Sequence, residues 1–128
     1  MACFEIVDSR IQDWKIKIQD TVADNASCGV FVLGDRLVDP RDVDLQTCGM
    51  VLEKNGDIVA TGAGAAALGA PANAVAWLAN KLGEFGVTFE PGQTILTGSF
   101  VRAMPVKAGD EVVARFDQGL GDVKTSFC

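Results

Sequence analysis

The sequence predicts an α+β domain that is mostly β, with one main helix over residues 71–86. Short β-prone runs are separated by turns rich in glycine, and Asn55-Gly56 lies between two such runs. One stretch alone, PANAVAWLANKLGEFG, repeats its apolar residues at helical spacing. A chain of 128 residues suits one domain with its own core, so we expect residues 1–128 to form a single domain.

The N-terminal part is expected to contain strands. CFEIVDSRI (3–11) opens as a strand, and WKIKI (14–18) alternates apolar with basic residues, which is typical of a half-exposed strand. Lys15 and Lys17 would then lie on its solvent face. The following segments are expected to be a short helix or structured loop, a strand, and a surface connection, over residues 20–28, 29–34 and 35–45.

A hairpin and the helix form the centre of the chain. Asn55-Gly56 within residues 48–62 predicts a two-residue type I′ turn, because both residues tolerate positive φ. Pro71 suits the first helical turn and Gly86 suits the helix end. An apolar stripe along this helix is expected to face the core and consists of Ala74, Trp77, Leu78, Leu82 and Phe85.

The C-terminal part is expected to contain three strands. TILTGSF (94–100) follows the turn signal EPGQ and ends at a glycine-containing segment. DEVVARF (110–116) and DVKTSF (122–127) alternate apolar and polar residues on either side of GLG. This pattern indicates a pair of neighbouring strands at the end of the chain.

Composition excludes several classes of function. The chain has no histidine and no tyrosine, so a Ser-His-Asp or Cys-His triad and His-ligated zinc or haem are ruled out. The net charge of −6, without any basic cluster, argues against nucleic acid or an anionic membrane as partner. No signal peptide or transmembrane run is visible, which favours a cytoplasmic protein. We therefore expect the four widely spaced cysteines to be free thiols.

The stretch TGAGAAALG (61–69) fits the spacing G-x-G-x-x-G/A of a loop that binds a dinucleotide pyrophosphate. The strand before these glycines is, however, the second arm of the predicted hairpin, and Gly69 and Pro71 separate the glycines from the helix. The alternative is close packing of a strand end rich in glycine and alanine against the helix. We favour this packing and expect no dinucleotide cofactor.

A few polar residues remain as candidates for chemistry. Glu5 interrupts an apolar strand, so it either faces water at a sheet edge or belongs to a site, as a metal ligand or a base. The run Asp24-Asn25-Ala26-Ser27 is either a helix cap and turn or part of a site. Thr97-Gly98-Ser99, at the end of a predicted strand, is equally suited to a turn. The residues alone leave these alternatives open.

The runs CFEIVDSRIQDWKIKIQDTVADNASCG, CGMVLEKNG, GAGAAALG and ILTGS resemble the hydratase and decarboxylase family of the fumarylacetoacetate hydrolase superfamily. The resemblance covers about residues 3–127 and is stronger to the 2-oxopent-4-enoate hydratases than to the 4-oxalocrotonate decarboxylases. It implies a mixed β-roll or sandwich core and a divalent metal, Mg²⁺ or Mn²⁺. It also implies hydration of 2-hydroxypenta-2,4-dienoate to 4-hydroxy-2-oxopentanoate in aromatic meta-cleavage catabolism.

The resemblance also implies roles for the candidate residues. Glu5 matches a metal-ligating glutamate, and the ion would chelate the carboxylate and 2-oxo oxygens of the substrate as a Lewis acid. Asp24, Asn25 and Ser27 would be catalytic residues beside the metal. Thr97 and Gly98 would approach the substrate carboxylate.

The family pattern is matched only in part. The resemblance implies that two further acidic ligands, a Glu-x-Glu pair, and a lysine precede the matching segment, and no Glu-x-Glu occurs in this chain. We therefore expect the chain to correspond to the C-terminal catalytic part, with the N-terminal part absent and the metal site incomplete. It is then either part of a hydratase or a module without catalysis. In both cases we expect self-association into a homo-oligomer, because apolar surface would be left uncovered.

Overall fold

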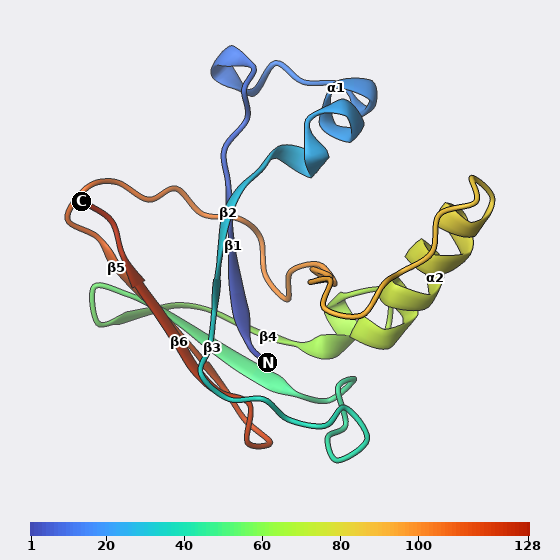
Figure 1. The fold of residues 1–128 in the computed structure, drawn as a ribbon. Helices are drawn as coiled ribbons and strands as arrows, with labels where there is room; N and C mark the ends of the chain where they lie inside the picture. The colour runs from blue at the N-terminus through green and yellow to red at the C-terminus, as the bar shows by residue number, and fades with distance from the viewer.

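The computed structural model describes all residues from 1 to 128 and contains two antiparallel sheets (Figure 1). The first sheet pairs β1 (Cys3–Val7) with β2 (Cys28–Leu33). The second has the strand order β4-β3-β5-β6. Its strands are β3 (Gly49–Lys54), β4 (Asp57–Ala63), β5 (Glu111–Phe116) and β6 (Gly121–Ser126). The fold is thus α+β and mostly β, as predicted.

Two α-helices and three short 3₁₀ turns complete the chain. The helices are α1 (Ile18–Ala23) and α2 (Pro71–Gly83). The 3₁₀ turns are η1 (Gln12–Trp14), η2 (Asn25–Ser27) and η3 (Gly64–Ala66). None of the helices combines the length and the apolar character needed to cross a membrane.

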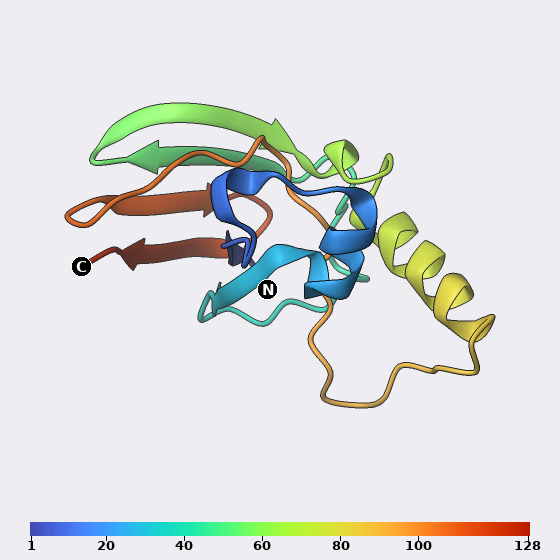
Figure 2. The same ribbon diagram turned by 90° about the horizontal axis from the view of Figure 1, so that it is seen from above.

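The core lies between the two sheets, where β1 and β2 cover one face of the four-stranded sheet (Figure 2). Alternation along β1 directs Ala2 and Phe4 toward this core, while Cys3 and Glu5 lie on the opposite face of the strand. The buried cluster consists of Ala2, Met50, Leu52, Val112, Ala114 and Val123. Each large apolar side chain buried here contributes about 1.5–3 kcal/mol.

The central hairpin forms as predicted. Asn55 and Gly56 connect β3 and β4 with φ of 54° and 88°, and Lys54 pairs with Asp57 across the turn. Both φ values lie in the left-handed region that a type I′ turn requires.

The glycines after this hairpin provide close packing. A Cβ at Gly62 would collide with the carbonyl oxygen of Phe100, and one at Gly64 with that of Leu45. The favoured packing is therefore seen, but the main contacts are made with the backbone of two loops and not with the helix.

The strand predicted over residues 14–18 is wrong. Asp13 and Trp14 have φ of 57° and 52°, which ends the extended run, and the strand that opens the chain stops at Val7. Asp20 accepts a hydrogen bond from the backbone N–H of Lys17 at 2.8 Å, which caps the start of α1. Local capping overrides the alternation of apolar and basic residues.

The strand predicted over residues 94–100 is also wrong. This stretch belongs to the long connection (residues 84–110) between α2 and β5, and it pairs with no strand. The apolar residues of the connection instead pack against the core from outside the sheet, and these are Phe100, Val101, Met104 and Val106. Within residues 94–100, Phe100 packs against this core, whereas Ile95 and Leu96 line a cavity beside β1, so the apolar residues are used without strand pairing.

Helix α2 begins at Pro71, as predicted, but ends at Gly83, and its apolar stripe does not fill the core. It projects away from both sheets, and only Pro71 is buried (Figures 1 and 2). Trp77 and Phe85 are 59% and 72% exposed. The side chains of β1, β2 and the long connection already occupy the space over the sheet.

Candidate functional site

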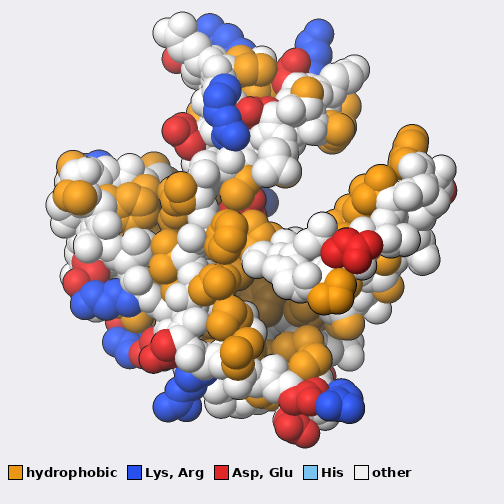
Figure 3. Space-filling model, in the orientation of Figure 1, with side chains coloured by type: hydrophobic (Ala, Val, Ile, Leu, Met, Phe, Trp, Pro, Cys, Tyr) orange, Lys and Arg blue, Asp and Glu red, His pale blue; other side chains and the backbone are white.

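A cavity of about 510 Å³ lies beside β1. Its walls come from β1, from the start of α2 and from the long connection. Glu5, Thr97 and Gly98 all line it, so the structure brings together three of the predicted site residues. Figure 3 shows the same side of the molecule hollowed between the α1 segment and α2, with hydrophobic side chains gathered along the middle.

Glu5 is the one carboxylate in this cavity. Its position on β1 opposite Phe31 of β2 places it on the face turned away from the core, and it is exposed. Most other lining residues are hydrophobic, and the one cation among them is Arg102. Its carboxylate oxygens can serve as ligands to a divalent cation.

The thiol of Cys28 lies beside Glu5 and was not among the sequence candidates. Burial raises the pKa of the Cys28 thiol, and the adjacent Glu5 carboxylate raises it further. The thiol is therefore protonated at neutral pH and acts as a weak donor beside the carboxylate. The β1–β2 pairing, which places Val7 opposite Cys28, is the signal that locates it.

The residues present supply an incomplete metal site. Three or more His, Cys, Asp or Glu side chains placed to hold an ion are not found together anywhere in the chain. Mg²⁺ favours octahedral oxygen coordination with one or two carboxylates and further oxygen ligands. Glu5 fits one of these positions, and the set as a whole does not fit the ion without ligands from elsewhere.

Asp24, Asn25 and Ser27 do not line the cavity, but they lie next to it in the fold. Their turn leads directly into Cys28, and the N–H of Asp8 donates to the carbonyl of Ser27 at 2.8 Å. Asn25, Ala26 and Ser27 have φ of 50°, 57° and 59°. Three consecutive left-handed residues other than glycine cost on the order of 1–3 kcal/mol each.

The hydroxyl of Ser27 is unusual because it has no hydrogen-bond partner. Ser27 is 2% exposed, and its Oγ is the one buried side-chain atom without a partner. Buried polar groups are nearly always paired, so an orphaned hydroxyl on a strained turn indicates a group held ready for a ligand.

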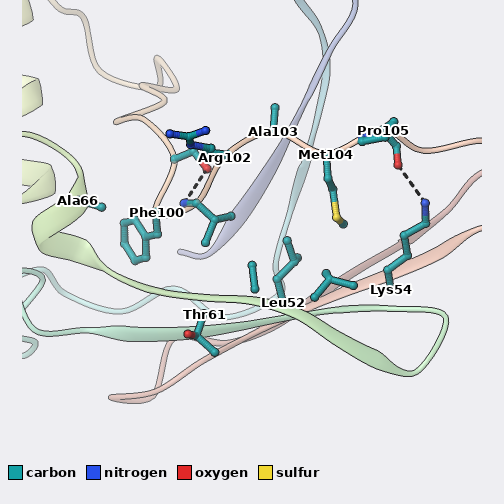
Figure 4. A pocket seen from close by; sticks show the side chains of 13 residues that line it. Leu52, Lys54, Thr61, Ala66, Phe100, Arg102, Ala103, Met104 and Pro105 are labelled. Atoms are coloured by element: carbon teal, nitrogen blue, oxygen red, sulfur yellow. Dashed lines mark hydrogen bonds between the residues drawn. The ribbon is translucent and has the colours of Figure 1, made fainter.

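A second cavity, of about 800 Å³, lies between the β3–β4 hairpin and the long connection (Figure 4). Lys54 points toward Pro105 in this view, donates to its carbonyl at 2.9 Å and also pairs with Asp110. Of the candidate residues named from the sequence, Ser99 alone lines this cavity, and it also lines the smaller one together with Glu5, Thr97 and Gly98. The smaller cavity, which contains Glu5, Thr97 and Gly98, is therefore the better candidate for the functional site.

Comparison with known proteins identifies the family. The sequence profile of the fumarylacetoacetate (FAA) hydrolase C-terminal family matches residues 1–127. The chain belongs to this family. Within the FAA hydrolase family, a 2-hydroxyhexa-2,4-dienoate hydratase of Comamonas testosteroni is 56% identical over 98% of the chain and 47% of the relative. A 2-hydroxypent-2,4-dienoate hydratase of Pseudomonas putida is 78% identical over 66% of the chain and 38% of the relative.

Solved structures show the same FAA hydrolase fold. The 4-oxalocrotonate decarboxylase from Pseudomonas putida G7, complexed with magnesium and adipate, matches with a TM-score of 0.93 and 45% identity. The match covers 98% of this chain and 48% of the decarboxylase. The chain thus spans about half the length of the relatives it matches, or less.

Proposed function

We propose that this chain serves as the C-terminal catalytic part of a hydratase that converts 2-hydroxypenta-2,4-dienoate to 4-hydroxy-2-oxopentanoate. The observation that carries the proposal is the convergence of Glu5, Thr97 and Gly98 on one cavity in a chain of this family. Relatives named as dienoate hydratases, at 56% and 78% identity, support the substrate class.

The proposed roles are those that the family resemblance implies, and the positions of the residues support them. Glu5 provides one ligand to a divalent cation, Mg²⁺ or Mn²⁺, whose other ligands come from outside the residues of this cavity. Thr97 and Gly98 hold the substrate carboxylate in the cavity that they share with Glu5. Asp24, Asn25 and Ser27 hold or move a proton from the adjacent turn, and the orphaned Ser27 hydroxyl supports this role. A cavity whose lining is mostly hydrophobic suits the carbon chain of a dienoate.

The decisive experiment is an assay of the chain with 2-hydroxypenta-2,4-dienoate and Mg²⁺, in which the reaction is monitored by the loss of the dienol absorbance. Metal-dependent appearance of 4-hydroxy-2-oxopentanoate is expected where another copy of the chain or a further segment supplies the metal ligands that this cavity lacks. 4-Oxalocrotonate is tested in parallel, because decarboxylase relatives are also similar at 45–46% identity. Release of carbon dioxide from 4-oxalocrotonate, without hydration of the dienoate, would replace the hydratase assignment with a decarboxylase assignment. Inactivity toward both substrates, with no metal affinity, would identify a module without catalysis.

We also propose that the chain associates with further copies of itself. Its accessible surface is 8624 Å², whereas a compact monomer of 13.5 kDa exposes about 6,500 Å². The excess of roughly 2,100 Å² per chain falls within the roughly 1,000–2,500 Å² that each partner buries in a large obligate interface. Large apolar side chains are exposed on both helical segments and on β2, including Trp77, Ile18, Val22 and Val30.

Sedimentation velocity is expected to show a dimer or larger species, and Trp77→Lys is expected to shift it toward monomer. Trp77 is 59% exposed on α2, so a charge there interrupts an apolar face without disturbing the core. Ala79→Lys, at an exposed position on the opposite side of the same helix, is the matched control and leaves the distribution unchanged. A monodisperse wild-type monomer would contradict the proposal.

A further inference from the structure

Arg10 connects three separate segments around the candidate site. Its Nη1 donates to the carbonyl of Asp8 at 2.7 Å, and its Nη2 donates to the carbonyl of Cys28 at 3.0 Å. Its Nε lies 3.0 Å from Oδ1 of Asp24, and its backbone N–H donates to Oδ2 of the same carboxylate at 3.3 Å. One side chain therefore joins the segment after β1, the start of β2 and the turn that follows α1.

We propose that Arg10 is a positioning residue that holds the Asp24–Ser27 turn against the strand carrying Glu5. The proposal rests on the proposed function, because Asp24 and Ser27 act in the reaction only in that case. Arg10 does not line the cavity, so it acts through these residues and does not touch the substrate.

The strained turn requires such a constraint. Three consecutive left-handed residues, Asn25 to Ser27, relax readily to ordinary backbone unless neighbouring groups hold both of their ends. Arg10 holds Asp24 directly before the turn and the carbonyl of Cys28 directly after it. The N–H of Asp8 adds a bond to the carbonyl of Ser27, and Arg10 in turn fixes the carbonyl of Asp8.

The geometry of the guanidinium explains the choice of residue. It presents several N–H donors in one rigid plane, which lets it serve acceptors on three segments together. A lysine carries the same charge as a single point on a flexible stem and cannot reproduce this arrangement. An ordinary ion pair at a half-exposed position would contribute little, so the backbone acceptors distinguish Arg10 from a solubilising charge.

The test compares Arg10→Lys with Arg41→Lys in the full chain. Arg41 pairs with Asp39 on an exposed loop and does not itself line the cavity, so its replacement makes the same chemical change without touching the Asp24–Ser27 turn or Glu5. Arg10→Lys is expected to lower kcat about 10–100-fold with KM within threefold of wild type, because misplaced groups slow the reaction. Added guanidinium is expected to restore part of the kcat of Arg10→Ala. A higher KM at unchanged kcat would overturn the proposal by placing Arg10 at the substrate.

A second measurement separates this inference from the proposed function. The Cα and Cβ chemical shifts and the HN–Hα couplings of Asn25, Ala26 and Ser27 report their left-handed backbone in the labelled chain. We expect these values to move toward ordinary ones in Arg10→Lys and to stay fixed in Arg41→Lys, whether or not the chain is active. Unchanged values in Arg10→Lys would overturn the role of Arg10. An inactive wild type would overturn the proposed function alone.

Discussion

Replacing Glu5 with glutamine is expected to lower both the affinity for Mg²⁺ and the rate of hydration. Glu5 is the one carboxylate lining the cavity, so the amide removes all formal negative charge from that lining while nearly preserving side-chain size. A bound metal ion typically contributes several kcal/mol to such a reaction, so we expect a loss of about 10²–10³-fold in kcat/KM. Calorimetric titration with Mg²⁺ and oxalate, a mimic of a 2-oxo acid, measures the binding change directly.

Glu84→Gln is the matched control for this experiment. It removes the same charge from a side chain that is 61% exposed, pairs with Lys81 and lies outside the cavity. We expect it to bind Mg²⁺ and oxalate as wild type does. Equal affinity in Glu5→Gln and Glu84→Gln would show that Glu5 is not a metal ligand. Absence of binding in the wild type would mean that the missing ligands are required before any ion binds.

Replacing Asp110 with alanine is expected to cause the largest loss of stability. The side chain of Asp110 is 3% exposed, and its Oδ2 lies 2.8 Å from the Lys54 ammonium. It also accepts hydrogen bonds at 2.9 Å from the Asn55 amide and from the Lys107 N–H. Asn55 in turn exchanges two hydrogen bonds with Glu111, so this network fixes the hairpin turn against the start of β5.

Removing one partner of a buried ion pair leaves the other charge uncompensated. Asp110→Ala should therefore lower the free energy of unfolding by about 3–5 kcal/mol. Glu84→Ala removes a surface ion pair with a similar N···O distance, and it should change the free energy of unfolding by less than about 1 kcal/mol. Urea unfolding measures both variants, with the slope m checked for constancy. Equal effects of the two variants would show that Asp110 has no special structural role.

The same network predicts the direction of a pH effect. The Lys54 ammonium, followed by the Asn55 amide and the Lys107 N–H, holds the pKa of Asp110 well below its usual range. In the unfolded chain the pKa of this carboxyl is about 3.9. Its contribution to stability is therefore fully present above that pH and is lost as pH falls toward the lower folded pKa. The stability difference between wild type and Asp110→Asn should shrink when unfolding is measured below about pH 4.

Local patterns predicted those elements whose stability depends on nearby residues. Asn55-Gly56 defined its own turn because few residues tolerate two successive left-handed positions, and β5 and β6 followed from alternation. Pro71 marked the start of α2 for a similar local reason. The resemblance to the hydratase and decarboxylase family, drawn from motifs, agrees with the profile match over residues 1–127.

The failures have two causes: packing between distant segments, which no short window contains, and a local helix cap that outweighs the alternation of apolar and basic residues. Residues 94–100 have the composition of a strand, but Phe100 packs onto the core while Ile95 and Leu96 line the cavity beside β1. Trp77 lies on a regular helical stripe, yet it is exposed because that core has no free face for α2. In residues 14–18, the left-handed Trp14 and the cap of α1 replaced the expected strand.

For the candidate site, the sequence by itself determined the chemical types of the residues and their family. It placed a carboxylate at Glu5 and excluded histidine chemistry, since composition and spacing are properties of the chain alone. The tertiary structure decided which of these groups meet. Glu5 and Thr97 share a cavity because the long connection crosses beside β1, and Cys28 lies beside Glu5 because β2 returns along the same strand. Contacts between segments far apart in the chain depend on packing, which no local pattern encodes.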